Sequence, residues 1–240
     1  MAGHSHWAGI KHKKGRQDKQ RSNLFSKLSR EITVAAKLGA KDPSSNPRLR
    51  SAIQAAKQYN MPKDNIERAI NKSELNLNES YENLRYEGFG PFNVAFIIET
   101  LTNNKNRTAS NIRTVLQKNG GRLGEHGSTA HLFQHCGVIH VSKKEFTDEK
   151  ILEMAINAGA MDCKSNSDHH EIISKKNDFN KVKSIIEKKV QTLQYFGIQW
   201  IPYNYLDTPK EENEKIIKIL ELLDDDDDIQ RIFTNCKVNL

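Results

Sequence analysis

The sequence predicts an α+β fold in which a helical N-terminal domain is followed by two α+β domains. Three patterns support this class. Apolar residues recur at helical spacing through residues 22–72, β-rich apolar runs begin only near residue 93, and residues 137–203 follow the order β-α-β-β-α-β. That order is typical of a ferredoxin-like unit. Two later elements have no partner within this unit, so we expect the last domain to be inserted in the second.

Three helices are expected in the N-terminal domain. The first covers residues 22–38, where Ser22 or Asn23 is a suitable N-cap and an apolar stripe follows. At about 100° per residue, Arg30 and Lys37 fall opposite this stripe, so we expect them to face solvent or a ligand. Asn46 caps the second helix, with Pro47 at its first position. A break at Asn60 and Met61 separates the second helix from the third, which begins near Pro62.

The remaining elements follow from shorter patterns. Residues 87–91 combine turn-forming types, and the polar residues 73–80 read as a linker. Asp224–Asp228 is interpreted as a solvated helix exit. The expected strands are 93–101, 137–141, 161–165, 170–174, 197–203 and 229–233, and the expected helices are 107–118, 148–159, 178–193 and 211–223.

These elements divide the chain into three expected domains. A basic helical domain with a flexible arm covers 1–76. An α+β domain joins 77–134 to 205–240, and a ferredoxin-like domain covers 135–204.

Positive charge is concentrated at the start of the chain. The 240 residues carry a net charge of +7, but residues 1–72 alone hold 16 Lys and Arg against 5 Asp and Glu. The remaining residues hold 21 basic and 25 acidic side chains, an excess of four negative charges. A basic N-terminal third beside an acidic remainder favours a polyanionic partner for the first part. The alternative for the basic arm alone is a solubilising tail.

The same region supplies the candidate nucleic-acid-binding residues. Clustered Lys and Arg side chains neutralise phosphates and release their counterions. His12 and Trp7 could stack on a sugar or base. The candidate residues are Lys11, His12, Lys13, Lys14, Arg16, Lys19, Arg21, Arg48, Arg50 and Lys63.

No enzyme is indicated by the remaining motifs. The glycines near 120–127 match neither a Walker A loop nor GxGxxG, and no nucleophile has an assigned partner. His126, His131, His135 and His140 are dense, but no carboxylate or cysteine completes a metal site at ligand spacing. We therefore expect no catalytic residue, no metal, no cofactor and no small-molecule substrate.

Cysteine usage and hydropathy indicate the cellular compartment in which the protein is expected. The three cysteines are far apart and form no CxxC pair, which favours reduced thiols in the cytoplasm. No apolar run reaches the length of a membrane span, so no membrane contact is expected. The basic start could mimic a transit peptide, but it lacks an amphipathic helical period.

Several motifs resemble one known family. They are MAGHSHWAGIKHKKGRQDKQR, REITVAAKLGAKDPSSNPRLRSAI, NMPKDNIERAI, YEGFGP, LTNNKNRT, GGRLGEHGS and DDDDDIQRIF. Together they resemble the YebC/PmpR family over essentially the whole chain. This resemblance implies three domains, with the third inserted in the second. The family's members are named probable transcriptional regulators, and a related mitochondrial branch acts as a translational activator.

The expected function is a non-enzymatic, DNA-binding regulator of transcription, present as a monomer. The alternative is a translation factor that binds ribosomal or transfer RNA, with the ribosome as a candidate partner. It is favoured by the lack of a clear helix-turn-helix pattern. A third possibility is a protein-binding module that acts through the acidic domains.

Overall fold

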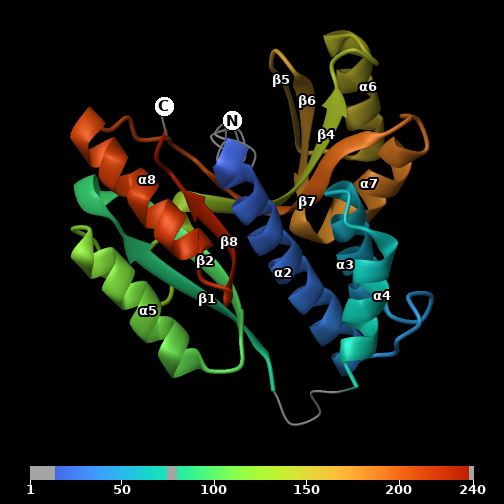
Figure 1. The fold of residues 1–240 in the computed structure, drawn as a ribbon. Coiled ribbons are helices and arrows are strands. Elements are labelled where there is room, and N and C mark those ends of the chain that lie inside the picture. The colour runs from blue at the N-terminus through green and yellow to red at the C-terminus, as the bar shows by residue number, and fades with distance from the viewer. Residues whose placement is uncertain (1–13, 75–79, 238–240) are drawn as a thin grey trace. The chain divides into compact units, whose positions relative to one another are not determined.

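The computed structural model describes residues 14–74 and 80–237 and has the α+β fold expected from the sequence. It divides into two compact units. One unit contains the described residues up to Leu132 together with those from Asn204 onward, and the other consists of Phe133–Tyr203. The second unit is thus inserted in the sequence of the first (Figure 1).

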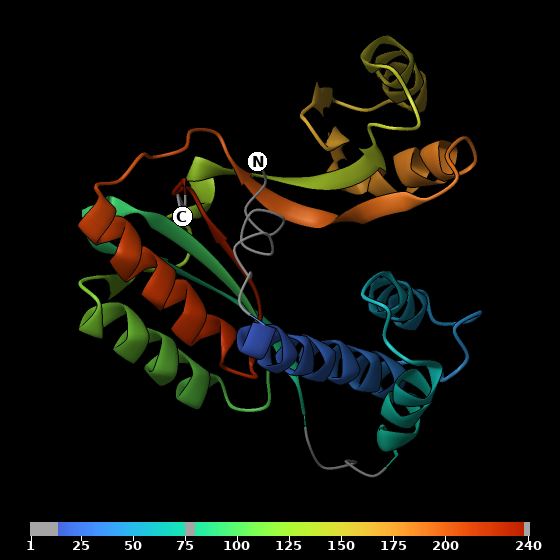
Figure 2. The ribbon, with the colours of Figure 1, turned by 45° about the horizontal axis from the view of Figure 1, so that its top comes forward.

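The first unit begins with a cluster of three helices, α2 (Lys14–Leu38), α3 (Pro47–Gln58) and α4 (Lys63–Lys72). Helices α3 and α4 lie against the C-terminal half of α2 (Figure 2), where Ile32, Leu49 and Ile66 share one apolar core. Asn46 caps α3 as predicted, because its side chain accepts a hydrogen bond from the Leu49 N–H at 3.0 Å.

The predicted start of α2 was wrong. The helix begins at Lys14 rather than near Ser22, so Ser22 and Asn23 lie inside it and are not caps. Residues 14–21 are mostly Lys, Arg and Gln, which have high helix propensity but form no apolar stripe. An apolar period therefore underestimates the length of this helix.

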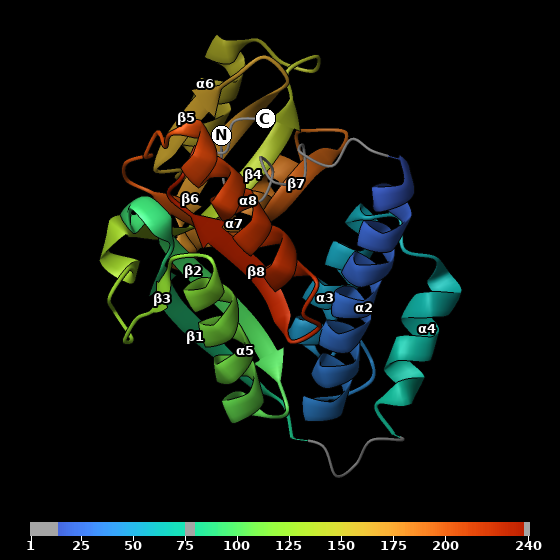
Figure 3. The same cartoon turned by 60° about the vertical axis from the view of Figure 1, so that its left-hand side comes forward.

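A four-stranded antiparallel sheet follows in the first unit, in the order β3-β1-β2-β8. Its strands are β1 (Glu82–Phe89), β2 (Ala95–Thr102), β3 (Arg122–Leu123) and β8 (Ile229–Thr234). Helices α5 (Lys105–Lys118) and α8 (Lys210–Asp224) pack on one face of it (Figure 3). Their contact forms a shared core that includes Phe96, Ile98, Ile112, Leu116 and Ile219.

Strand β1 was not predicted. Glu87, Gly88 and Phe89 were expected in a turn, but they pair with β2 from Glu87↔Ile97 to Phe89↔Ala95. Cross-strand pairing with a buried strand outweighs the turn preference of these residues. The chain turns after them, through the short 3-10 helix η1 (Pro91–Asn93).

The second unit has the predicted ferredoxin-like element order. Its elements are β4 (Phe133–Ser142), α6 (Asp148–Ala158), β5 (Asp162–Ser165), β6 (His169–Lys175), α7 (Phe179–Glu187) and β7 (Leu193–Pro202). The strands pair antiparallel in the order β5-β6-β4-β7. Both helices bury apolar side chains on one core, which includes Ile139, Ile151, Ile172, Val182 and Ile186. Helix α7 ends at Glu187, six residues earlier than predicted.

Two further 3-10 helices are short, η2 (Ala130–Leu132) in the first unit and η3 (Lys176–Asp178) in the second. Within residues 14–74 and 80–237, none of the helices combines the length and the apolar character needed to cross a bilayer.

Candidate nucleic-acid interface

The predicted phosphate-binding residues fall in two groups, one at the start of the chain and in α2, and the other in α3 and α4. Lys11, His12 and Lys13 lie outside the described residues. Lys14, Arg16 and Lys19 belong to the first turns of α2, for which only the backbone is described. Arg21 follows them on the same helix and is exposed, with its guanidinium carbon 5.3 Å from the centroid of the Phe25 ring.

The cations of α3 and α4 have partners within the helical cluster. Arg48 makes a bidentate contact with Glu31, with Nε–Oε1 and Nη2–Oε2 distances of 2.8 and 3.2 Å. Arg50 donates from Nη1 to the Pro43 and Ser44 carbonyl oxygens at 2.8 and 3.1 Å. Lys63 lies 3.4 Å from Glu67, although 87% of its side chain is exposed. The exposed Lys63 and Arg50 can still reach a polyanion, whereas Arg48 must share its charge with Glu31.

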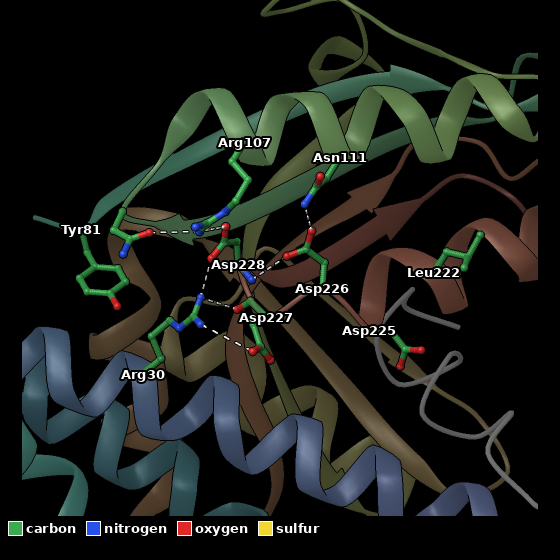
Figure 4. Close-up of a pocket in the computed structure, with 10 residues that line it drawn as sticks. Arg30, Tyr81, Arg107, Asn111, Leu222, Asp225, Asp226, Asp227 and Asp228 are labelled. Carbon is green, nitrogen blue, oxygen red and sulfur yellow. Dashed lines mark hydrogen bonds and ion pairs between the residues drawn. The ribbon is translucent and has the colours of Figure 1, made fainter. Parts of the chain in front are cut away.

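Asp224–Asp228, called the acidic loop below, connects α8 to β8 and is not simply solvated. Asp228 is buried, with 6% of its side chain exposed. Figure 4 shows Arg30 of α2 and Arg107 of α5 approaching it from opposite sides. Its carboxylate accepts hydrogen bonds from Arg30 Nη1 at 2.8 Å, Arg107 Nη2 at 2.6 Å, Thr108 Oγ1 at 2.9 Å and Thr102 Oγ1 at 3.2 Å.

These contacts keep Asp228 ionised. Burial alone would raise its pKa, but hydrogen bonds from Arg107, Thr108 and Arg30 hold the pKa below the ordinary value of a carboxyl group. The same carboxylate raises the pKa of Arg107. Asp228 is therefore a fixed negative charge and unsuited to acid–base catalysis near neutral pH.

An open pocket of about 590 Å³ lies around the acidic loop. Two guanidinium groups, two amides and four carboxylates line it, so it offers hydrogen bonds and charge rather than an apolar surface. Asn111 binds the Asp226 carboxylate at 3.1 Å within it. The lining residues are Arg30, Tyr81, Asn103, Arg107, Asn111, Leu222, Asp225, Asp226, Asp227 and Asp228.

Sequence reasoning did not connect Arg30, Arg107 and Asp228. Arg30 was placed opposite the apolar stripe of its helix, facing solvent or a ligand, and its contact with the acidic loop was missed. The available signal was the run of five aspartates, together with the arginine in LTNNKNRT. Such a run requires compensating cations if any of its carboxylates is buried.

The histidines that were considered as metal ligands have other contacts. His126 Nε2 lies 2.8 Å from Arg85 Nη2, and the His135 ring stacks on Trp200 at 3.9 Å. The Nδ1 atom of His131 lies 3.3 Å from the Gly127 carbonyl oxygen.

One further group brings three potential ligand atoms together in the second unit. Atoms of His140, His169 and Glu171 lie within 4.8 Å of one another. The two imidazole rings are stacked, with centroids 4.0 Å apart and planes inclined by 24°. Since nitrogen lone pairs lie in the ring planes, these two do not converge on one point. The Asn166 amide also contacts His169 Nε2 at 3.0 Å. We therefore assign no metal to this group.

Two family models match the chain. The TACO1/YebC protein N-terminal domain matches residues 5–76, and the TACO1/YebC second and third domain matches residues 81–236. The chain belongs to the TACO1/YebC family. The resemblance seen in the sequence motifs is thereby confirmed.

Relatives within the TACO1/YebC family match over nearly full length. A probable transcriptional regulatory protein of Pelagibacter ubique is 56% identical over 235 residues, covering 98% of each chain. One from Zymomonas mobilis is 47% identical over 239 residues, covering 100% of this chain and 96% of its own. The crystal structure of a conserved hypothetical protein from Aquifex aeolicus superposes with a TM-score of 0.82 at 42% identity, covering 98% of each chain.

Proposed function

We propose that this chain is a non-enzymatic, nucleic-acid-binding regulator of gene expression that acts in the cytoplasm. Its basic N-terminal region contacts phosphates, and DNA is the leading target. The relatives named as probable transcriptional regulatory proteins support a regulatory role.

The observation that carries the proposal is the uneven distribution of charge. Residues 1–72 contain 16 basic and 5 acidic side chains, although the whole chain carries only +7. Eight of the 16 lie within the first 30 residues, against one carboxylate. Such a density of Lys and Arg binds a phosphate backbone through counterion release. No side-chain pattern for reading base edges accompanies it, so backbone contacts and nucleic-acid shape dominate recognition.

The experiment that tests this proposal is a binding titration with the full chain. The variant K13A/K14A/R16A removes three cations at and just before the start of α2. We expect it to bind all sequences more weakly by about the same factor. The slope of log K against log salt shrinks by roughly 0.9 for each lost phosphate contact. The readout is fluorescence anisotropy of labelled duplexes of different sequence.

A matched control removes three exposed lysines from the second unit. K144A/K150A/K181A lowers the net charge by the same amount but alters only surface far from the N-terminal region in sequence. If the two triple variants lose equal affinity, net charge rather than the N-terminal region explains binding, and the proposed contact surface is wrong.

A second candidate target is ribosomal or transfer RNA. The lack of a clear helix-turn-helix pattern in the sequence favours it. Sedimentation of the protein from lysate through a sucrose gradient, with and without nuclease, separates the two targets. Co-migration with ribosomes that is lost at high salt supports RNA, whereas free migration with retention on DNA fragments supports DNA.

The remaining alternative is a protein-binding module in which the basic arm serves only solubility. Deletion of residues 1–21 distinguishes this case. A protein-binding module keeps its partner after the deletion, whereas a nucleic-acid-binding regulator loses most of its affinity for nucleic acid.

A further inference from the structure

One face of α2 binds the acidic loop with regularly spaced side chains. Asn23, Lys27 and Arg30 follow one another at intervals of four and three residues. At about 100° per residue, these positions lie within roughly 60° of one another around the helix. They therefore form a continuous polar stripe, called the α2 stripe below.

Each member of the α2 stripe donates to the acidic loop. Asn23 Nδ2 lies 3.0 Å from Asp225 Oδ1. Lys27 Nζ lies 2.9 Å from Asp224 Oδ1 and 2.7 Å from the Asp224 carbonyl oxygen. Only 7% of the Lys27 side chain remains exposed, so this cation is largely covered by its contacts.

Arg30 completes the stripe. Its Nη1 donates to Asp228 Oδ1 at 2.8 Å and to the Asp227 carbonyl oxygen at 2.7 Å (Figure 4). Lys27 and Arg30 would bind a phosphate group through N–H groups that here donate to oxygen atoms of the chain itself.

We infer that the acidic loop is an internal competitor for a phosphate-binding face of α2. The inference rests on the proposed nucleic-acid binding and extends it to Lys27 and Arg30. Arg16 and Lys19 precede the α2 stripe in the same helix. A phosphate backbone that follows α2 from Arg16 toward its C-terminus reaches Lys27 and Arg30 only after they leave the acidic loop.

The contacts are suited to such an exchange. The Arg30–Asp227 pair is open to water, because Asp227 is 69% exposed, and such a pair contributes little net stability. The Lys27–Asp224 pair is more covered, at 7% and 25% exposed, so a phosphate that draws Lys27 away must replace the contacts that Lys27 loses. Asp228 keeps Arg107, Thr102 and Thr108 as partners when Arg30 departs. The loop thus retains an anchor while the α2 stripe changes partner, and the exchange leaves no buried carboxylate unpaired.

The first test uses carbodiimide, which joins an amine to a carboxylate without a spacer. In the unmodified full chain, Lys27 Nζ and Asp224 Oδ1 are 2.9 Å apart and form a crosslink that mass spectrometry of peptides can quantify. The pair Lys237–Asp207, at 3.1 Å, is the internal control. The probes are a DNA duplex and a folded RNA of matched length, both without terminal phosphates.

Saturation with the bound nucleic acid is expected to lower the Lys27–Asp224 crosslink roughly threefold or more, while the control crosslink is unchanged. If only one of the two probes lowers the Lys27–Asp224 crosslink, that probe identifies DNA or RNA as the source of the phosphates. An unchanged Lys27–Asp224 crosslink at saturation overturns the inference but leaves the proposed function standing. If neither probe binds, the proposed function fails and this inference fails with it.

The second test is the variant D224N/D225N/D227N, which keeps the buried Asp228 and neutralises the three other carboxylates that contact the α2 stripe. Its matched control is E149Q/E153Q/D178N, which removes three exposed carboxylates from the second unit. We expect the loop variant to bind nucleic acid roughly three- to tenfold more tightly than the control. The slope of log K against log salt should be steeper by the amount that about two additional phosphate contacts produce. Equal affinities and equal slopes for the two variants overturn the inference.

Discussion

Arg30 and Asp228 are joined by an ion pair in which Nη1 and Oδ1 are 2.8 Å apart, although 198 residues separate them in the sequence. Asp228 is buried and is shared with Arg107 of α5. This carboxylate therefore connects helix α2, helix α5 and the start of β8. Its charge matters for the stability of the first unit as well as for the position of the acidic loop.

Replacement of Asp228 is expected to destabilise the protein. In D228N the shape is preserved, but two guanidinium groups lose their buried counter-charge, at a cost of about 2–4 kcal/mol in the free energy of unfolding. The exposed neighbour provides the control, because D227N is expected to change this free energy by less than about 0.5 kcal/mol. Urea denaturation measures both. Equal losses in the two variants would contradict the role assigned to Asp228.

The same carboxylate makes stability depend on pH. The pKa of Asp228 is lowered in the folded state, so the stability that it contributes is present above the unfolded pKa of about 3.9 and is lost as the pH falls through the lower folded value. The difference in free energy of unfolding between wild type and D228N should be largest above about pH 5 and should shrink below about pH 4. A difference that grows on acidification would reverse the predicted sign.

Glu87 is predicted to hold the segment between β3 and η2. Its fully buried carboxylate accepts the N–H groups of Gly127, Thr129 and Ala130 at 2.9, 2.7 and 2.9 Å. E87Q replaces one acceptor oxygen by an amide donor, which is expected to lower the free energy of unfolding by about 2–3 kcal/mol. The amides of Thr129 and Ala130 should then exchange faster with solvent. E125Q, an exposed change in the same segment, should leave both quantities near wild type.

The three free cysteines should differ in reactivity. Burial raises the pKa of Cys136 to about 12, and Cys136 has no exposed surface. Cys163 is partly exposed, although burial raises its pKa as well. With iodoacetamide at pH 8, Cys163 should be alkylated first, and Cys136 and Cys236 only after unfolding. Alkylation of native Cys136 as fast as Cys163 would contradict the packing described for β4.

The sequence is informative about periodic elements and less so about their partners. The ferredoxin-like order of the second unit followed from its alternating patterns, because each element buries one face in a local core. The early start of α2 was missed since residues 14–21 have helix propensity but no apolar period. Strand β1 was missed because Glu87 and Gly88 have turn preferences that pairing with β2 overrides.

The candidate site illustrates the same limit. Helical spacing placed Arg30 opposite the apolar stripe, but spacing within one helix cannot identify a partner 198 residues away. The basic N-terminal region, by contrast, was found from composition alone, because charge density does not depend on tertiary contacts. Its candidate residues remain predictions, since their role depends on a partner outside the chain.

The measurement that tests the central claim most directly is formaldehyde crosslinking of the full chain to nucleic acid, followed by mass spectrometry of the peptides that carry nucleotide. We predict that most crosslinked peptides come from residues 1–30, with Lys27 joining them as the acidic loop is displaced. Nucleotide found only on peptides from residues 133–203 would contradict the assignment of phosphate binding to the N-terminal region.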